Sequence, residues 1–341
     1  MGLLEKIYPE FNVCSIIGMS KNSGKTFTLN HLIEEADMAG LSMGITSIGR
    51  DGERIDVVTE TDKPTIFLPK DNWVATTTEL LDLSEATVAI EKVTPFTTPL
   101  GGVVVGRVIY DGYIQISGPQ TLHDTRQVAE DMLELGSDVV LIDGALDRKT
   151  TAAPEITEAT ILAAGASYNR DMETVVRETA HIARLFKLPL LEDHRDLVAE
   201  LVRDKTHALI DKDGQVRTLE MKTALGAGRR ISEAISQDTE YVLIPGALTL
   251  NLAKDLVDLA PGIGRVKIIV ADTTKVFIDD RNYRRLVKRG LYIEALHRSK
   301  LVAIAINPFA PEGYSFDAYE FREQMKEAIP DVDVVDLMLG G

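Results

Sequence analysis

The chain has 341 residues, which at roughly 150 residues per domain is enough for two domains with well-buried cores. Hydrophobic residues make up 45% and charged residues 26%, with 25 Gly and 13 Pro, so a disordered, low-complexity or collagen-like chain is excluded. The formal net charge of -16 disfavours general nucleic-acid binding, because an acidic surface repels phosphate backbones.

The chain contains one cysteine, Cys14, which has no second cysteine with which to form an internal disulfide. Residues 1–11 carry charges and a proline and lack the apolar core of a signal peptide. No apolar stretch approaches the roughly 18 residues needed to span a bilayer. We therefore expect a cytoplasmic protein that has no membrane partner.

The first predicted elements form a βαβ unit. Residues 13–18 are a short apolar strand, residues 26–38 place apolar side chains on one helical face, and Gly40 ends that helix. Residues 42–48 predict the next strand. Because a helix that connects two strands in this way makes them parallel, the pattern implies a parallel sheet.

The middle of the chain predicts a mixture of strands and helices. Short strands are expected over 65–68, 102–110 and 113–116, with a hairpin at Asp111 and Gly112, and a short helix over 78–83. A strong amphipathic helix follows over 119–135 and leads into an apolar strand over 138–143. Two further helices are expected over 157–166 and 171–186.

The second half alternates strands and helices again. Strands are expected over 206–210, 215–219, 241–244, 266–270, 301–306 and 332–337, and helices over 248–259, 279–291 and 316–329. We expect a domain boundary near residue 190, which gives an N-terminal domain over 1–190 and a second α/β domain over 191–341.

The strongest chemical signal lies between the first strand and the first helix. A glycine-containing turn there lets backbone N–H groups converge on phosphate oxygens at the positive end of a helix dipole. The expected nucleotide-binding residues are Gly18, Ser20, Lys21, Asn22, Ser23, Gly24, Lys25 and Thr26. Lys25 is expected to reach the β- and γ-phosphates and Thr26 to ligate Mg²⁺. Five residues separate Gly18 from Gly24, one more than the usual spacing.

A phosphate loop also needs an acidic residue at the end of a neighbouring strand to orient Mg²⁺. Asp143, which ends the apolar strand, fits this role, and Asp51 is a further expected ligand, with Asp56 as its competitor. Arg148 or Lys149 would neutralise charge that develops during phosphoryl transfer. The alternative interpretations, without a role in catalysis, are a solvated turn around Asp51 and an exposed basic loop around Arg148.

The loop is similar to that of dethiobiotin and cobyric acid synthetases, which has the same spacing and binds ATP, although Met19 stands where that family has Thr. Three stretches together resemble a narrower family, the lysine 5,6-aminomutase reactivase subunits: GMSKNSGKT (18–26), IDGALDRK (142–149) and INPFAPEGYSFD (306–317). TSIGRDGE (46–53) and TILAAG (160–165) add to this resemblance.

The resemblance implies a P-loop NTPase-like parallel sheet with helices on both faces, which binds ATP and Mg²⁺. It also implies a factor that exchanges damaged cobalamin on an adenosylcobalamin-dependent aminomutase, together with a second, MutS-like ATPase subunit. The C-terminal domain would then face the partner, with residues 307–317 as a contact loop or a plain connection. Two other functions stay open: a ligase that activates a carboxylate as an acyl phosphate, and a nucleotide sensor that does not hydrolyse.

Overall fold

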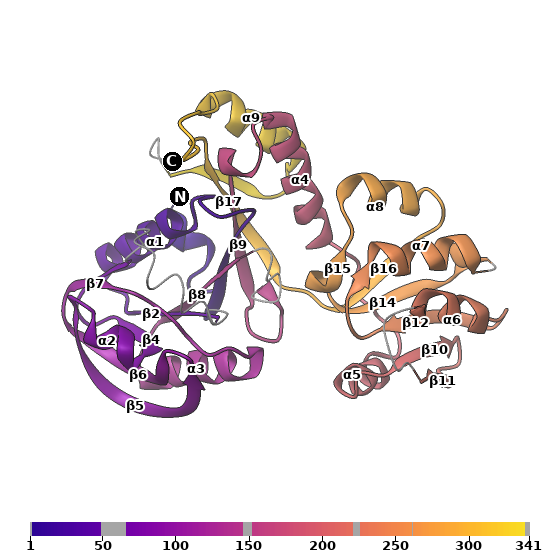
Figure 1. Cartoon of the computed structure of the whole chain (residues 1–341), viewed down its shortest axis with the longest axis horizontal. Helices are drawn as coiled ribbons and strands as arrows, with labels where there is room; N and C mark the ends of the chain where they lie inside the picture. Colours follow the sequence, from indigo (N-terminus) through magenta and orange to yellow (C-terminus); the bar gives the residue numbers. More distant parts are fainter. Residues whose placement is uncertain (1, 49–65, 146–151, 221–225, 261, 338–341) are drawn as a thin grey trace. The chain divides into compact units, whose positions relative to one another are not determined.

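The structure is a computed structural model that describes residues 2–48, 66–145, 152–220, 226–260 and 262–337. The chain divides into two compact units. Unit 1 comprises Met1–Val176 and Ser299–Gly341, and unit 2 comprises Arg177–Arg298. Figure 1 shows both units as α/β structures, with the chain passing from unit 1 into unit 2 and returning to unit 1 for its last strands.

Unit 1 is built on a nine-stranded sheet with the order β18-β17-β9-β1-β8-β2-β4-β6-β5. All neighbours from β18 to β4 are parallel, and β6 is antiparallel to both β4 and β5. The expected mostly parallel α/β sheet is thereby confirmed. The strands are β1 (Val13–Gly18), β2 (Met43–Ser47), β4 (Trp73–Thr77), β5 (Thr87–Thr98), β6 (Gly101–Tyr110), β8 (Val139–Ala145), β9 (Ala159–Gly165), β17 (Lys300–Asn307) and β18 (Asp333–Asp336).

Helices cover both faces of this sheet. Successive side chains of a strand point to opposite faces, so one strand contributes to an apolar cluster on each face. Val139 and Leu141 of β8 pack in the apolar cluster that contains α1, whereas Val140 and Ile142 pack in the cluster that contains α3. The helices of unit 1 are α1 (Lys25–Ala39), α2 (Thr78–Asp82), α3 (Leu122–Leu135) and α9 (Ala318–Ala328), and α4 (Met172–Leu185) begins there.

The hairpin expected at Asp111 and Gly112 is wrong. β6 pairs with β4 and β5, and the strand after Gly112, β7 (Gly112–Ile114), pairs instead with β3 (Ile66–Leu68). The real hairpin joins β5 to β6 through a turn that ends at Gly101, whose φ of 97° favours glycine. Figure 1 shows β5 and β6, in purple, as a long curved pair at the edge of the sheet.

The helix expected over 157–166 is also wrong, since this segment forms β9. All seven residues of β9 are buried, and the strand pairs in parallel with β1 on one side and β17 on the other. Alanine and leucine are good helix formers, but a strand buried on both faces also shows a continuous apolar run. The hydroxyl of Thr160 meets those of Ser15, at 2.9 Å, and Ser299, at 3.0 Å, so it stays hydrogen-bonded inside the sheet.

Unit 2 contains a five-stranded mixed sheet with the order β11-β10-β12-β14-β16. The strands expected over 206–210 and 215–219 are confirmed as β10 and β11, which are antiparallel neighbours. The strands of this sheet are β10 (His207–Asp211), β11 (Val216–Leu219), β12 (Thr239–Ile244), β14 (Lys267–Asp272) and β16 (Ile293–His297). In addition, β13 (Leu248–Thr249) pairs with β15 (Val276–Phe277). The helices are α5 (Arg195–Arg203), α6 (Ala227–Ala234), α7 (Leu250–Leu259) and α8 (Asp280–Val287).

The boundaries of the units differ from the expected division at residue 190. The last strands, β17 and β18, belong to the sheet of unit 1, because β17 pairs with β9 along the whole of that strand. The N-terminal segment lies beside them, where Lys6 pairs with Asp333. Unit 2 is therefore an insertion between β9 and β17 rather than a C-terminal domain.

Candidate phosphate-binding site

The glycine-containing loop starts in the interior of the large sheet. Gly18 is the last residue of β1, and Lys25 and Thr26 are the first two residues of α1. β1 has β8 on one side and β9 on the other, so the loop emerges at the carboxyl edge of parallel strands. Ligands of open α/β sheets bind at this edge. The amide of Met19 donates to the carbonyl of Ala163 on β9 at 2.8 Å, which ties the start of the loop to the sheet.

The loop folds back over its own first glycine. A Cβ atom at Gly18 would lie 2.2 Å from Ser23 Oγ and less than 3 Å from Lys25 Cγ, so only glycine fits there. Asn22 and Gly24 have left-handed backbones, with φ of 64° and 103°. These conformations are those in which Gly, and next Asn, cost least. The residue types of the motif are therefore required by the shape of the loop.

The start of α1 lies directly after this loop. Gly24 occupies the N-cap position of α1 and, as a glycine, has no side chain with which to cap the first turn of the helix. The first amides of a helix have no partner within it, so they are available to an anion and lie at the positive end of the helix dipole. The first turn of α1 contains no acidic residue that would compete for this place.

Ser23 adds an unsatisfied group inside the loop. The residue is 1% exposed, and its Oγ has no hydrogen-bond partner in the described part of the chain. A buried hydroxyl without a partner costs about 1–3 kcal/mol, so such groups usually mark a place where a ligand or ion completes the structure. This observation fits a loop that holds a phosphate.

Lys25 and Asp143 come together at the edge between β1 and β8. Lys25 Nζ lies 3.9 Å from Asp143 Oδ1, and their side chains are 20% and 35% exposed. Register places Asp143 beside Ile16 of β1 on one side and Ser47 of β2 on the other. A partly exposed ion pair is worth at most about 1 kcal/mol, so it opens readily when a phosphate group competes for the lysine.

The other expected site residues lie in the loop, in α1 or outside the described ranges. In the loop, the Ser20 Oγ lies 2.9 Å from the Ser167 Oγ, and Lys21 is exposed. Thr26 is half-buried in the first turn of α1. Residues outside the described ranges are Asp51, Asp56, Arg148 and Lys149. The described structure thus brings the loop residues and Asp143 together.

Asn307, which was not among the site residues expected from the sequence, lies at the end of β17 and contacts the loop. Its Nδ2 donates to the carbonyl of Asn22 at 3.3 Å. The sequence assigned residues 307–317 to a partner contact or a connection, because pairing of β17 with β9 is not visible in the local pattern.

Cys14 does not supply a nucleophile to this site. It lies within β1 and is fully buried, and this burial raises the pKa of its thiol well above the usual range. A thiol is a poor nucleophile until it loses its proton.

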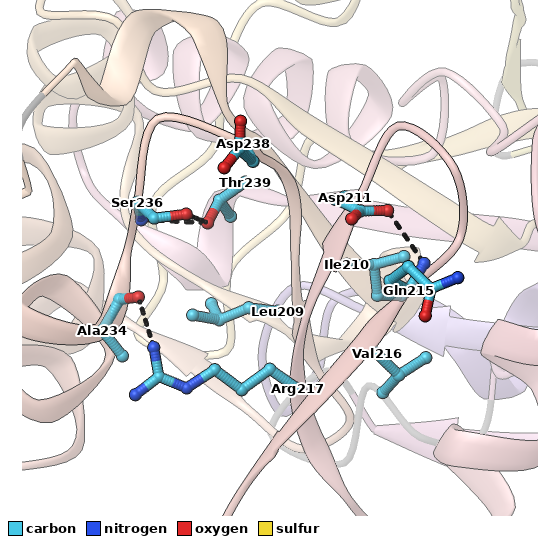
Figure 2. Close-up of a pocket in the computed structure, with 10 residues that line it drawn as sticks. All are labelled: Leu209, Ile210, Asp211, Gln215, Val216, Arg217, Ala234, Ser236, Asp238 and Thr239. Atoms are coloured by element: carbon cyan, nitrogen blue, oxygen red, sulfur yellow. Dashed lines mark hydrogen bonds between the residues drawn. The ribbon is translucent and has the colours of Figure 1, made fainter.

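Unit 2 contains a separate shallow hollow of about 230 Å³ next to β10 and β11. Figure 2 shows that Arg217, Thr239 and Asp211 bond to other groups of the hollow itself. Arg217 donates to the carbonyl of Ala234 at 3.3 Å, and Ser236 N donates to Thr239 Oγ1 at 3.0 Å. Because these groups satisfy one another, the hollow presents weaker ligand chemistry than the loop of unit 1.

Neither the family models nor the curated proteins with which the chain was compared give a match. Within the described ranges, no helix combines the length and apolar character needed to cross a membrane. No three His, Cys, Asp or Glu side chains gather there in a way that would hold a metal ion. A magnesium ion bound together with phosphates needs only one or two protein ligands, so the loop remains the best candidate for a functional site.

Proposed function

We propose that the chain binds Mg-ATP at residues 18–26 and hydrolyses it. The observation that carries this proposal is the position of Lys25, which starts a helix directly after a tight glycine loop and lies 3.9 Å from Asp143 on the adjacent strand. Backbone amides, a lysine and a carboxylate that orients Mg²⁺ are groups that phosphoryl transfer uses. The support is chemical and local, from residues that the fold brings together.

The residues of the site fit both the phosphates and the magnesium ion of Mg-ATP. The amides of the loop and the Lys25 ammonium would hold the phosphates, and the unsatisfied Ser23 hydroxyl lies inside the same loop. Thr26 and Asp143 supply the oxygen ligands that Mg²⁺ prefers. When bound, the ion neutralises charge on the phosphates. Asp51 and Arg148 remain proposed for the metal and for charge neutralisation during transfer.

ATP is the proposed nucleotide. The sequence contains no Asn-Lys-x-Asp motif for recognition of guanine, since no Asn in the chain is followed by Lys. The same loop spacing occurs in the ATP-binding synthetases that the loop resembles.

We further propose that this ATPase is a subunit of a reactivating factor for an adenosylcobalamin-dependent aminomutase, acting with a MutS-like second subunit. Release of a tightly held, damaged cobalamin costs free energy. Nucleotide can supply it only if ATP and ADP bind two conformations of the factor with different affinity. The support is the sequence resemblance of residues 18–26, 142–149 and 306–317, two of which meet at the loop through Asn22 and Asn307.

The second candidate function is a synthetase that activates a carboxylate as an acyl phosphate. The spacing of Gly18 and Gly24 favours it, because dethiobiotin and cobyric acid synthetases have this loop. Trapping with hydroxylamine separates the two proposals. A synthetase forms a hydroxamate only when its carboxylic acid substrate is present, whereas a reactivating factor hydrolyses ATP faster when the aminomutase is added.

Titration with Mg-ATP tests the shared step. Lys25→Ala should weaken binding at least about 100-fold, because loss of a charged partner of phosphate costs about 3 kcal/mol. Lys326→Ala is the control, since Lys326 lies on α9 and pairs with Glu323 on the same helix. Equal Mg-ATP affinity of Lys25→Ala and the unmodified protein would contradict the proposed function.

A further inference from the structure

The end of β17 lies directly against the phosphate loop, and Asn307 makes the contact. Its main chain is paired with Gly165 of β9, so the residue sits at the carboxyl edge of the sheet. Its side-chain Nδ2 donates to the carbonyl of Asn22 at 3.3 Å, and its Oδ1 accepts from the amide of Phe309 at 3.1 Å. The second bond orients the side-chain amide so that its N–H groups face the loop.

Two glycines allow this close approach. A Cβ at Gly24 would lie 3.1 Å from Asn307 Cβ, and a Cβ at Gly165 would lie 3.2 Å from the same atom and 3.1 Å from the carbonyl oxygen of Ser23. Any larger residue at either position would push the loop and β17 apart. The loop is thus packed against Asn307 as well as hydrogen-bonded to it.

The segment that follows Asn307 is itself fixed to the sheet. Tyr314 donates its hydroxyl to the carbonyl of Ala166 at 2.5 Å, and the Arg170 guanidinium lies over the ring of Tyr314, 5.2 Å from its centre. Ala166 directly follows β9. Asn307 therefore lies between β17, which is paired with β9, and a segment that is bonded to the residue after β9.

We propose that Asn307 is a positioning residue that holds the phosphate loop in its binding-competent shape. This inference rests on the proposed function, since it names how the same site is preformed. Asn22 adopts a left-handed backbone, which costs an asparagine less than most residues with a side chain but more than a glycine. The hydrogen bond to its carbonyl stabilises that conformation before phosphate arrives, so the ligand does not have to order the loop.

The experiment measures two ligands on the full chain: Mg-ATP and tripolyphosphate with magnesium. Asn307→Ala should weaken both by the same factor, about 3- to 10-fold, because one hydrogen bond that orders the loop is lost. Asn307→Asp keeps the acceptor for Phe309 N but places a carboxylate oxygen against the Asn22 carbonyl, so it should weaken both ligands further. Asn251→Ala, at an exposed position of α7, is the control that should change neither.

The outcomes separate the roles of the residue. If Asn307→Ala weakens Mg-ATP but leaves tripolyphosphate unchanged, the side chain reads the nucleoside and the proposal is overturned. Unchanged affinity for both ligands overturns it as well. Thermal unfolding without ligand shows whether Asn307→Ala is folded. If it is not, the affinities of Asn307→Asp for the two ligands test the proposal. Unchanged binding in Lys25→Ala would reject the ATP site itself, whereas loss in Lys25→Ala with no effect at Asn307 rejects only this inference.

Discussion

Lys25 Nζ and Asp143 Oδ1 lie 3.9 Å apart although 118 positions separate the two residues in the chain. The parallel pairing of β1 and β8 produces this proximity, because it brings the end of one strand level with the end of the other. A cation that would bind phosphate and a carboxylate that would orient Mg²⁺ therefore share one edge of the sheet.

Asp143→Asn should separate binding from hydrolysis. The amide keeps the shape of the side chain but loses the charge that favours a metal ion, so the Mg²⁺ concentration needed for half-maximal hydrolysis should rise about 10-fold or more. Nucleotide binding should change much less. Steady-state hydrolysis across a magnesium titration measures the effect.

Asp138→Asn is a matched control for this change. Asp138 lies just before β8, at the opposite end of the same strand, and accepts a hydrogen bond from the Ser42 amide at 2.7 Å. Its substitution should leave the magnesium requirement unchanged. An equal rise in both variants would point to a general loss of stability rather than a metal role of Asp143.

Thr26→Ala should raise the magnesium requirement of nucleotide binding, whereas Thr26→Ser should retain most of the unmodified affinity. The serine keeps the hydroxyl that is proposed to ligate the ion, and both variants lose the methyl group. Titration of ATP at low and high Mg²⁺ concentration gives the comparison. Equal behaviour of Ala and Ser would remove Thr26 from the metal site.

Gly24→Ala should impair nucleotide binding at least about 10-fold, because the new Cβ strains a left-handed backbone and crowds Asn307. Gly40→Ala provides the matched test of strain alone. Gly40 also has a left-handed backbone, with φ of 69°, but a Cβ there meets nothing within 4 Å. Both variants should lose about 1–2 kcal/mol of unfolding free energy, and only Gly24→Ala should lose affinity.

Asp280→Asn should reduce the stability of unit 2 in a pH-dependent way. Burial works to raise the pKa of Asp280, but hydrogen bonds from Arg284 and Arg184, both at 2.9 Å, outweigh it and leave the pKa below its ordinary value of 3.8. A carboxyl whose pKa is lowered by folding stabilises the protein above its unfolded-state pKa, and the stabilisation disappears as pH falls through the lower folded-state pKa.

The difference between Asp280→Asn and the unmodified protein should therefore be about 1–2 kcal/mol at pH 7, since both arginines are partly exposed, and should shrink below pH 3.8. Scanning calorimetry or circular dichroism is the suitable measurement. The single tryptophan, Trp73, lies in unit 1 and does not report on unit 2. A constant difference from pH 7 to the acid range would contradict the assigned charge pairing.

The first βαβ unit was predictable because its signals agree at several levels. Residues 13–18 are mostly apolar, Gly24 precedes the helix, and Gly40 ends it with a left-handed backbone. Local propensity, helix termination and the glycine loop all indicated the same structure, and α1 begins within one residue of its expected start. Asp143 could also be predicted, because an apolar run followed by a carboxylate is a pattern visible in the local sequence.

The parts of the fold and of the site that could not be predicted depend on pairing between segments that are distant in the sequence. β9 is rich in alanine, so its local preference is helical, and only its position between β1 and β17 makes it a strand. Register shifts beside Pro95 interrupt the alternation of β5, which hid the real hairpin. Asn307 could not be placed in the site because no local pattern shows which sheet β17 joins.

The insertion of unit 2 has a consequence for synthesis of the protein on the ribosome. β9 is translated early, but its neighbour β17 is made only after the roughly 120 residues of Arg177–Arg298. At about 5–20 residues per second, the ribosome needs roughly 6–24 s for this stretch. During that interval the nascent sheet has an open, alanine-rich edge, and a chain that stops prematurely in unit 2 keeps that edge available for aggregation.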